Sequence, residues 1–246
     1  MGNSPLISYT KISPNKTSPR NHKIDTITIH CVVGQCSVET IGAIFAPSSR
    51  QASSNYGVGP DGRIGMYVEE KDRSWCSSNA SNDHRAITIE VASDTTHPYK
   101  ITDAAYNGLI KLLVDICKRN DIKELKWQAN KTLIGDILKQ NMTVHRWFSA
   151  TACPGDYLYN LHGKIADEVN KLLGISDSCE PYLVRVSISN LNIRKGPGTD
   201  YKTIGKFTGK GAFTIVETKS GKGSTAGWGR LKSGLGWISL DYTSKV

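Results

Sequence analysis

The sequence lacks several features that would place it in a specialised class of protein. No segment holds the roughly 20 consecutive apolar residues that a membrane-spanning helix requires, so we expect no membrane span. The first 20 residues are polar and contain three prolines, where a secretory signal peptide would have an apolar core. We therefore expect a protein made in the cytoplasm without a signal peptide.

The six cysteines include no Cys-x-x-Cys pair. That absence disfavours a zinc ribbon and a dithiol redox motif. In a chain that is expected to stay in a reducing compartment, a disulfide framework is also disfavoured. We expect most of the thiols to be small buried side chains, and one of them to take part in chemistry.

Acidic residues are scarce in the last quarter of the chain. Residues 180–246 contain 11 Lys and Arg but 4 Asp and Glu, a net charge of +7, whereas residues 1–179 hold 20 and 18, a net charge of +2. Such asymmetry indicates an anionic partner for the tail. Because the basic residues are scattered among glycines and form no stripe on a helix, nucleic acid is not expected as that partner.

The residues that are present predict an α/β domain over residues 1–174. Its predicted elements are strands at 24–31 and 86–91, two short strands within 56–70, and helices at 37–46, 102–117 and 154–173. A short linker rich in Ser and Asp follows at 175–181.

Beyond the linker, residues 182–246 show no helical period. Short β-rich segments alternate with glycine-rich connections, which is typical of a small β-barrel. The predicted strands lie at 184–186, 191–194, 214–216 and 236–238.

His145 and Cys153 lie eight residues apart, just before the last predicted helix. On spacing alone, metal binding and structural roles both stay open. Pro154 is a favourable first helical residue, so Cys153 is expected at a helix N-terminus, where a thiolate is stabilised. His30 closes the first strand and is a candidate third ligand. Two His and one Cys would leave a tetrahedral Zn²⁺ with one open position.

The order of these motifs resembles the zinc-dependent type-2 N-acetylmuramoyl-L-alanine amidases, which share a fold with peptidoglycan recognition proteins. The resemblance covers about residues 20–174, and the sequences of segments 143–148 and 152–159 are similar to those of endolysins of clostridial prophages. It implies a mixed central sheet flanked by helices and a Zn²⁺ cofactor bound by His30, His145 and Cys153. The implied reaction cleaves the amide between N-acetylmuramic acid and L-alanine.

The same resemblance assigns two catalytic residues. Glu90, which ends an Ile-Thr-Ile-Glu run, corresponds to the general acid/base, with a structural ion pair as the alternative because a buried charge needs a partner. Thr151 stands where a lysine is frequent and would steady the oxyanion through its hydroxyl. Other members use a tyrosine at the position of Ser54, so Tyr56 is expected to be a core residue.

Several other residues are expected to be structural. Cys76 follows a tryptophan where the family usually has Trp-His, which weakens any role for that loop. Cys31 neighbours His30 on a strand and should point to the opposite face as a structural thiol. The remaining histidines lie in polar stretches and are expected at the surface: His22, His84, His97 and His162.

The tail resembles a bacterial SH3-type cell-wall-binding domain over residues 182–243. The resemblance rests on the segment 191–201 and on two later Gly-Trp pairs. It implies a small SH3-like barrel that contacts a wall ligand through Arg194, Tyr201 and Trp237, with barrel core as the alternative role for the tryptophan.

These features together predict a peptidoglycan hydrolase of the endolysin or autolysin type. We expect a monomer whose partners are bacterial peptidoglycan and its anionic wall polymers, and which acts on the wall after release from the host cytoplasm. Two alternatives stay open. One is a non-catalytic peptidoglycan receptor of the same fold, and the other is a cysteine hydrolase with Cys153 as nucleophile and His145 as base.

Overall fold

The computed structural model describes residues 2–174 and 181–246, which form two compact units. Unit 1 is Met1–Leu173 and unit 2 is Gly174–Val246. Apart from Pro181, the expected linker at 175–181 lies outside the described residues. No helix among the described residues has the length and apolar character needed to cross a membrane.

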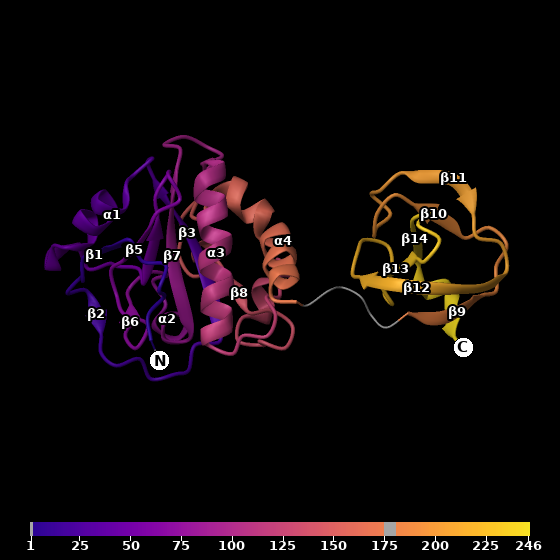
Figure 1. The fold of residues 1–246 in the computed structure, drawn as a ribbon, viewed down its shortest axis with the longest axis horizontal. Coiled ribbons are helices and arrows are strands. Elements are labelled where there is room, and N and C mark those ends of the chain that lie inside the picture. Colours follow the sequence, from indigo (N-terminus) through magenta and orange to yellow (C-terminus); the bar gives the residue numbers. More distant parts are fainter. Residues whose placement is uncertain (1, 175–180) are drawn as a thin grey trace. The chain divides into compact units, whose positions relative to one another are not determined.

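Unit 1 is built on a mixed six-stranded sheet (Figure 1). β4 and β5 are antiparallel, with Gly59 and Gly62 in the turn between them, and the other neighbours are parallel. In spatial order the strands are β1 (Tyr9–Thr10), β5 (Ile64–Met66), β4 (Tyr56–Val58), β7 (Ala86–Ser93), β3 (Thr26–Val33) and β8 (Met142–Thr143). A separate antiparallel pair joins β2 (Lys16–Thr17) to β6 (Arg73–Ser74).

The predicted helices are confirmed in unit 1, and one short helix was not predicted. The four are α1 (Val38–Phe45), α2 (Ala80–Arg85), α3 (Asp103–Arg119) and α4 (Gly155–Leu172), with 3₁₀ turns η1 (Ser48–Arg50), η2 (Lys131–Leu133) and η3 (His145–Trp147). Ser37 and Thr102 cap α1 and α3 through their side chains, as Ser and Thr commonly do. Figure 1 shows α3 and α4 side by side across one face of the sheet.

The two faces of the central strands differ in chemistry. Ile27 and Ile29 of β3 pack with α3 and α4 in the main core. The residues that alternate with them on β3, Thr28 and His30, are also fully buried, but they are polar. Because side chains alternate along a strand, these polar residues share the face away from α3 and α4. That buried polar face is where the candidate site lies.

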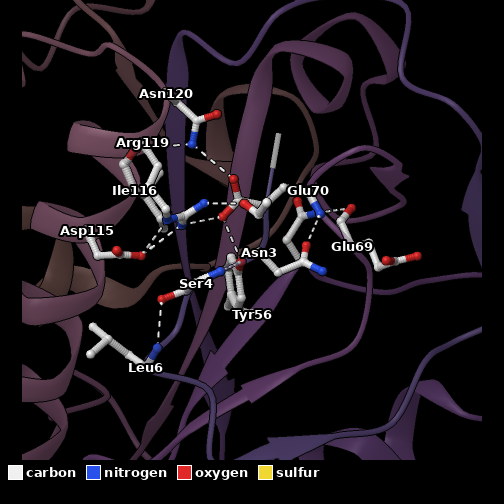
Figure 2. Close-up of polar contacts among 12 residues, drawn as sticks. Asn3, Ser4, Leu6, Tyr56, Glu69, Glu70, Asp115, Ile116, Arg119 and Asn120 are labelled. Atoms are coloured by element: carbon white, nitrogen blue, oxygen red, sulfur yellow. Dashed lines mark hydrogen bonds and ion pairs between the residues drawn. The ribbon is translucent and has the colours of Figure 1, made fainter.

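Tyr56 is a core residue, as predicted, and belongs to a buried polar network (Figure 2). Its hydroxyl donates to Oε1 of Glu70 at 2.6 Å, and Arg119 from the end of α3 also donates to Oε1 at 2.6 Å. Asn120 donates to Oε2 at 2.9 Å, and the backbone N–H of Ser4 donates to the Tyr56 hydroxyl at 3.0 Å. The network ties the N-terminal segment to the sheet and to α3.

Unit 2 is a seven-stranded sheet whose pairings are all antiparallel. In spatial order the strands are β11 (Thr203–Phe207), β10 (Asn192–Arg194), β14 (Trp237–Ser239), β13 (Trp228–Leu231), β12 (Gly211–Lys219), β9 (Tyr182–Val186) and β15 (Thr243–Lys245), with the turn η4 (Leu240–Tyr242). The four predicted β segments fall within or overlap β9, β10, β12 and β14. Their apolar residues form a separate small core that includes Val184, Ile193 and Ile215.

Candidate active site

His30 and Glu90 lie side by side on the polar face of the sheet. β3 and β7 are parallel, and their register places His30 opposite Glu90. Gly57 of β4 lies opposite Glu90 on its other side. Since residues in register on parallel strands project to the same face, the imidazole and the carboxyl group point the same way. The pairing of β3 with β7 therefore places the first two side chains of the site next to each other.

His145 and Cys153 reach the same place from the segment between β8 and α4. β8 pairs with β3, so the chain leaving β8 passes directly beside His30. The ring centroids of His30 and His145 are 5.1 Å apart, and Sγ of Cys153 lies 3.4 Å from Nδ1 of His30. One donor atom from each of the three residues lies within 4.8 Å of the other two. The structure thus brings together the three predicted metal ligands.

Arg146 closes the loop between these two ligands. Its backbone N–H donates to the carbonyl oxygen of Cys153 at 3.1 Å. Its guanidinium donates to the carbonyl oxygen of Ala152 at 2.6 Å and to Oδ1 of Asp156 at 2.9 Å. His97, exposed as predicted, lies 2.8 Å from the other oxygen of Asp156. These hydrogen bonds therefore hold in place the loop that carries His145 and Cys153.

Cys153 lies directly before α4, with Pro154 at the cap position. A hydrogen bond with the thiol of Cys31 and burial raise the pKa of Cys153 well above its usual range. The stabilisation of a Cys153 thiolate at the helix N-terminus stays a prediction. Cys31 lies in the main core with Ile27 and Ile29, on the face opposite His30 as expected, and its thiol also contacts Cys153.

Glu90 has the environment of a carboxyl group that changes its protonation near neutral pH. Burial raises the pKa of Glu90 to about 7. The thiol of Cys76 donates to Oε1 at 3.8 Å, and Oε2 is buried with no hydrogen-bond partner among the described residues. No salt bridge to Glu90 is present within residues 2–174 and 181–246, so the alternative of a structural ion pair has no support. A carboxyl group with a pKa near the working pH suits general acid/base chemistry.

Thr151 lies in the same loop, two residues before Cys153. Its Oγ1 accepts a hydrogen bond from the backbone N–H of Cys153 at 3.3 Å, and the residue is exposed. Accepting that bond uses a lone pair and leaves the hydroxyl proton available to another group.

Two residues at the site were missed by sequence reasoning. Cys76 touches Glu90, and Oγ of Ser78 lies 3.2 Å from Nε2 of His145. Both lie in the loop between β6 and α2, which approaches the site because α2 leads directly into β7. The only signal in the sequence was the unusual cysteine after Trp75.

His162 is not a surface residue, contrary to the prediction. It is fully buried, its Nδ1 lies 2.7 Å from the carbonyl oxygen of Leu158, and its ring packs 4.5 Å from that of Trp127. Burial lowers the pKa of His162 to about 4. Its spacing of four from Leu158 and three from Ile165 places it on the apolar face of α4, and that signal could have identified it.

The three predicted wall-ligand residues in unit 2 are not brought to one pocket. A cavity of about 310 Å³ is lined by Arg194 and Trp228, among others, but not by Tyr201 or Trp237. Arg194 donates to the carbonyl oxygen of Tyr201 at 2.8 Å, so it also braces the following loop. Tyr201 is 46% exposed, whereas Trp237 is 8% exposed and pairs with Arg194 across β10 and β14.

Comparisons with known proteins bear on unit 1. The PlyG catalytic domain matches with a TM-score of 0.51 at 14% identity, over 66% of this chain and 93% of that chain. PlyL matches with a TM-score of 0.50 at 15% identity, over 65% and 95%. The endolysin amidase LysCS from Clostridium intestinale is 18% identical over 67% and 98%, with a TM-score of 0.47. At these identities the first two likenesses show the fold alone. A comparison with curated proteins gives no match.

A family model supplies the assignment that the structural likenesses leave open. The model described as N-acetylmuramoyl-L-alanine amidase matches residues 20–156, more than half of the chain. The matched range contains His30, Glu90, His145 and Cys153, which the structure gathers at one place. The chain belongs to the N-acetylmuramoyl-L-alanine amidase family and is a peptidoglycan hydrolase.

Proposed function

We propose that His30, His145 and Cys153 hold a zinc ion and that Glu90 is the general acid/base of the amidase. The observation that carries this proposal is the gathering of two imidazoles and one thiol within 4.8 Å, next to a half-buried carboxyl group. The bond hydrolysed is the amide between the lactyl group of N-acetylmuramic acid and L-alanine.

The donor set fits zinc. Zinc in proteins favours nitrogen and sulfur ligands, and three protein ligands with one open position are typical of catalytic sites. Burial lowers the pKa of His30 to about 3 and also lowers the pKa of His145, so both rings are neutral at pH 7 and keep a lone pair for a metal. The half-buried thiol of Cys153 would lose its proton on binding the metal.

The chain's own residues would handle the protons. When bound, zinc supplies a Lewis acid that polarises the scissile carbonyl and lowers the pKa of a water molecule. Oε1 of Glu90 is engaged by Cys76, and its free Oε2 accepts the proton of the attacking water and returns it to the leaving amine. The free hydroxyl proton of Thr151 donates to the oxyanion.

The site argues against the alternative of a cysteine hydrolase. The contacts of Cys153 are with Nδ1 of His30 and the thiol of Cys31, whereas Nε2 of His145 contacts Ser78. A nucleophilic cysteine needs its base within hydrogen-bond reach, and among the described residues His145, the base of that alternative, makes no hydrogen bond with Cys153. The complete ligand set and Glu90 likewise argue against a non-catalytic receptor.

Unit 2 supports the targeting part of the proposal. It has its own core and an all-antiparallel sheet, as an SH3-like wall-binding barrel would, and it carries most of the net positive charge of the chain. A cationic module is attracted to the anionic polymers of the bacterial wall. We therefore propose an endolysin-like enzyme that acts on the wall and is held there by unit 2.

End-group analysis tests the assigned bond directly. Purified peptidoglycan is digested, and the newly formed groups are identified. We expect free amino groups of L-alanine to appear with time while reducing sugar ends stay constant. New reducing ends, or free amino groups of another amino acid, would contradict the assignment.

A further inference from the structure

Cys76 is held beside Glu90 by a firmly anchored loop. Its backbone N–H donates to Oδ2 of Asp83 at 3.0 Å, and the N–H of Ser77 donates to both oxygens of the same carboxylate at 3.2 and 3.1 Å. Asp83 is 2% exposed, so moving the loop would leave a buried carboxylate without its donors. The thiol is therefore a fixed part of the site.

Cys76, Glu90 and His30 form a second group of potential ligands that overlaps the first. One donor atom from each lies within 4.8 Å of the other two. Nε2 of His30 and Oε2 of Glu90 are both buried and have no hydrogen-bond partner among the described residues. Buried polar atoms in proteins almost always have partners, so this pair of atoms points to a ligand.

From this geometry we infer a second metal site, in which Cys76 and Glu90 bind Zn²⁺ or Cd²⁺ and His30 lies at the edge shared with the first site. Thiolate, carboxylate and imidazole are ligands that these ions accept. On binding, Cys76 releases its thiol proton to solvent, and its sulfur and a Glu90 oxygen each donate a lone pair to the ion. Because the neutral His30 ring has one lone pair, which the first ion takes, the second ion keeps only Cys76 and Glu90 as protein ligands and binds more weakly than the first.

Occupancy of the second site inhibits hydrolysis. The ion takes the Glu90 lone pair that would otherwise accept a proton from water. This consequence rests on the proposed function, whereas the binding itself does not. A simpler role for Cys76, as a hydrogen-bond donor that only orients Glu90, would involve no metal, and the experiment separates the two.

The binding experiment is a Cd²⁺ titration of the metal-free full chain, followed by ultraviolet absorption of the thiolate–cadmium bond and by the number of ions bound. The variants are Cys76→Ser and Cys153→Ser, with Cys36→Ser as a control thiol outside both groups. We expect Cys76→Ser to bind one weak ion fewer and to lose the absorption of the Cys76 thiolate–cadmium bond. Cys153→Ser should keep that absorption, and Cys36→Ser should match the native protein.

The activity experiment uses solubilised peptidoglycan and buffered free Zn²⁺. Native activity should rise with the first ion and fall at higher Zn²⁺. Loss of even an outer partner of a metal site costs roughly 10–100-fold in affinity. The free Zn²⁺ concentration that inhibits Cys76→Ser should therefore be at least about tenfold higher than the one that inhibits the native protein. Thermal melting checks that the variant folds, and Cys76→Ala replaces it if it does not.

Two results would overturn the inference. One is a folded Cys76 variant that binds cadmium and is inhibited by Zn²⁺ just as the native protein is. The other is a Cys153→Ser variant that shows no thiolate–cadmium absorption. Failure of the proposed function has a different outcome, in which activity does not depend on the first ion while the Cys76-dependent cadmium step persists.

Discussion

Individual side chains at the site owe their chemistry to where they are buried. Glu90 would have an ordinary acidic pKa in water, but burial raises it to about 7. His30 and His145 are kept neutral for the same reason, since removing a charged imidazole from water is costly. Burial thus gives the proposed proton acceptor and two of the proposed metal ligands the protonation that these roles need.

Glu90→Gln should remove the proton acceptor while keeping the shape of the side chain. We expect a rate loss of about two to four orders of magnitude, the usual scale for a general acid/base, with the first metal ion still bound. The comparison is the rate of Ser54→Ala on solubilised peptidoglycan, because the Ser54 hydroxyl donates only to the backbone carbonyl oxygen of Tyr56 among the described residues. A loss below about tenfold would reduce Glu90 to a supporting role.

Removal of metal should abolish hydrolysis, because Cys153 and the two histidines otherwise face one another as neutral groups with no Lewis acid between them. We expect a chelator to stop release of soluble fragments, and one equivalent of Zn²⁺ to restore it. Full activity in protein shown by elemental analysis to be metal-free would refute the zinc assignment.

At the scale of elements, the loop from η3 to α4 has to present two ligands from positions eight residues apart. Arg146 braces this loop through Ala152 and Asp156, and its guanidinium also lies 4.9 Å from the ring centre of Tyr159. The arginine therefore connects the loop to the first turn of α4. We regard it as a positioning residue for His145 and Cys153.

Arg146→Ala should loosen that loop and weaken zinc binding by roughly 10–100-fold, the range seen when outer partners of metal ligands are removed. Competition with a chromogenic chelator measures the affinity directly. Arg63→Ala is the matched control, because that arginine pairs with the exposed Glu39. Equal affinities in the two variants would show that Arg146 does not position the ligands.

The network in Figure 2 concerns stability and not catalysis. Glu70 is 1% exposed, so Arg119→Ala would leave its carboxylate buried without its cation. We expect the free energy of unfolding to fall by about 3 kcal/mol, since breaking a buried pair is strongly destabilising. Urea unfolding is compared with Lys123→Ala, whose pair with Asp121 is exposed and should contribute little. A change in Arg119→Ala no larger than in the control would contradict the prediction.

For the whole molecule, the proposed function assigns catalysis to unit 1 and wall binding to unit 2. Every candidate ligand and the acid/base lie in unit 1, whereas unit 2 carries the excess positive charge. Each unit has a hydrophobic core of its own. Joining a binding module to a catalytic one raises the local concentration of the catalytic site at a surface.

Residues 1–174 alone should therefore cleave solubilised peptidoglycan but act more slowly than the full chain on intact walls. Residues 180–246 alone should sediment with walls without hydrolysing them. Part of that binding should weaken with salt, because charges are screened beyond about 8–10 Å at physiological ionic strength. A pull-down across a salt series measures this. If the tail stays in the supernatant at every salt concentration, on walls that the full chain lyses, unit 2 has no targeting role.

Much of this architecture was readable from local sequence patterns. Apolar spacing and capping residues predicted α1, α3 and α4, and β-branched runs predicted β3 and β7. The motif order placed His30, His145 and Cys153 in one family pattern, and the structure brings them together. Such signals succeed because hydrophobic period, caps and short motifs act within a few residues of one another.

Contacts between distant segments were not readable in this way. Cys76 meets Glu90 because the side chains of Ser74 and Thr88 hydrogen-bond at 2.7 Å and bring the two segments together. Likewise, Cys31 reaches Cys153, and the tryptophan against which His162 is buried comes from another segment. The pKa of a thiol or a carboxyl group depends on burial and on neighbours from other elements, and those are set when the elements pack.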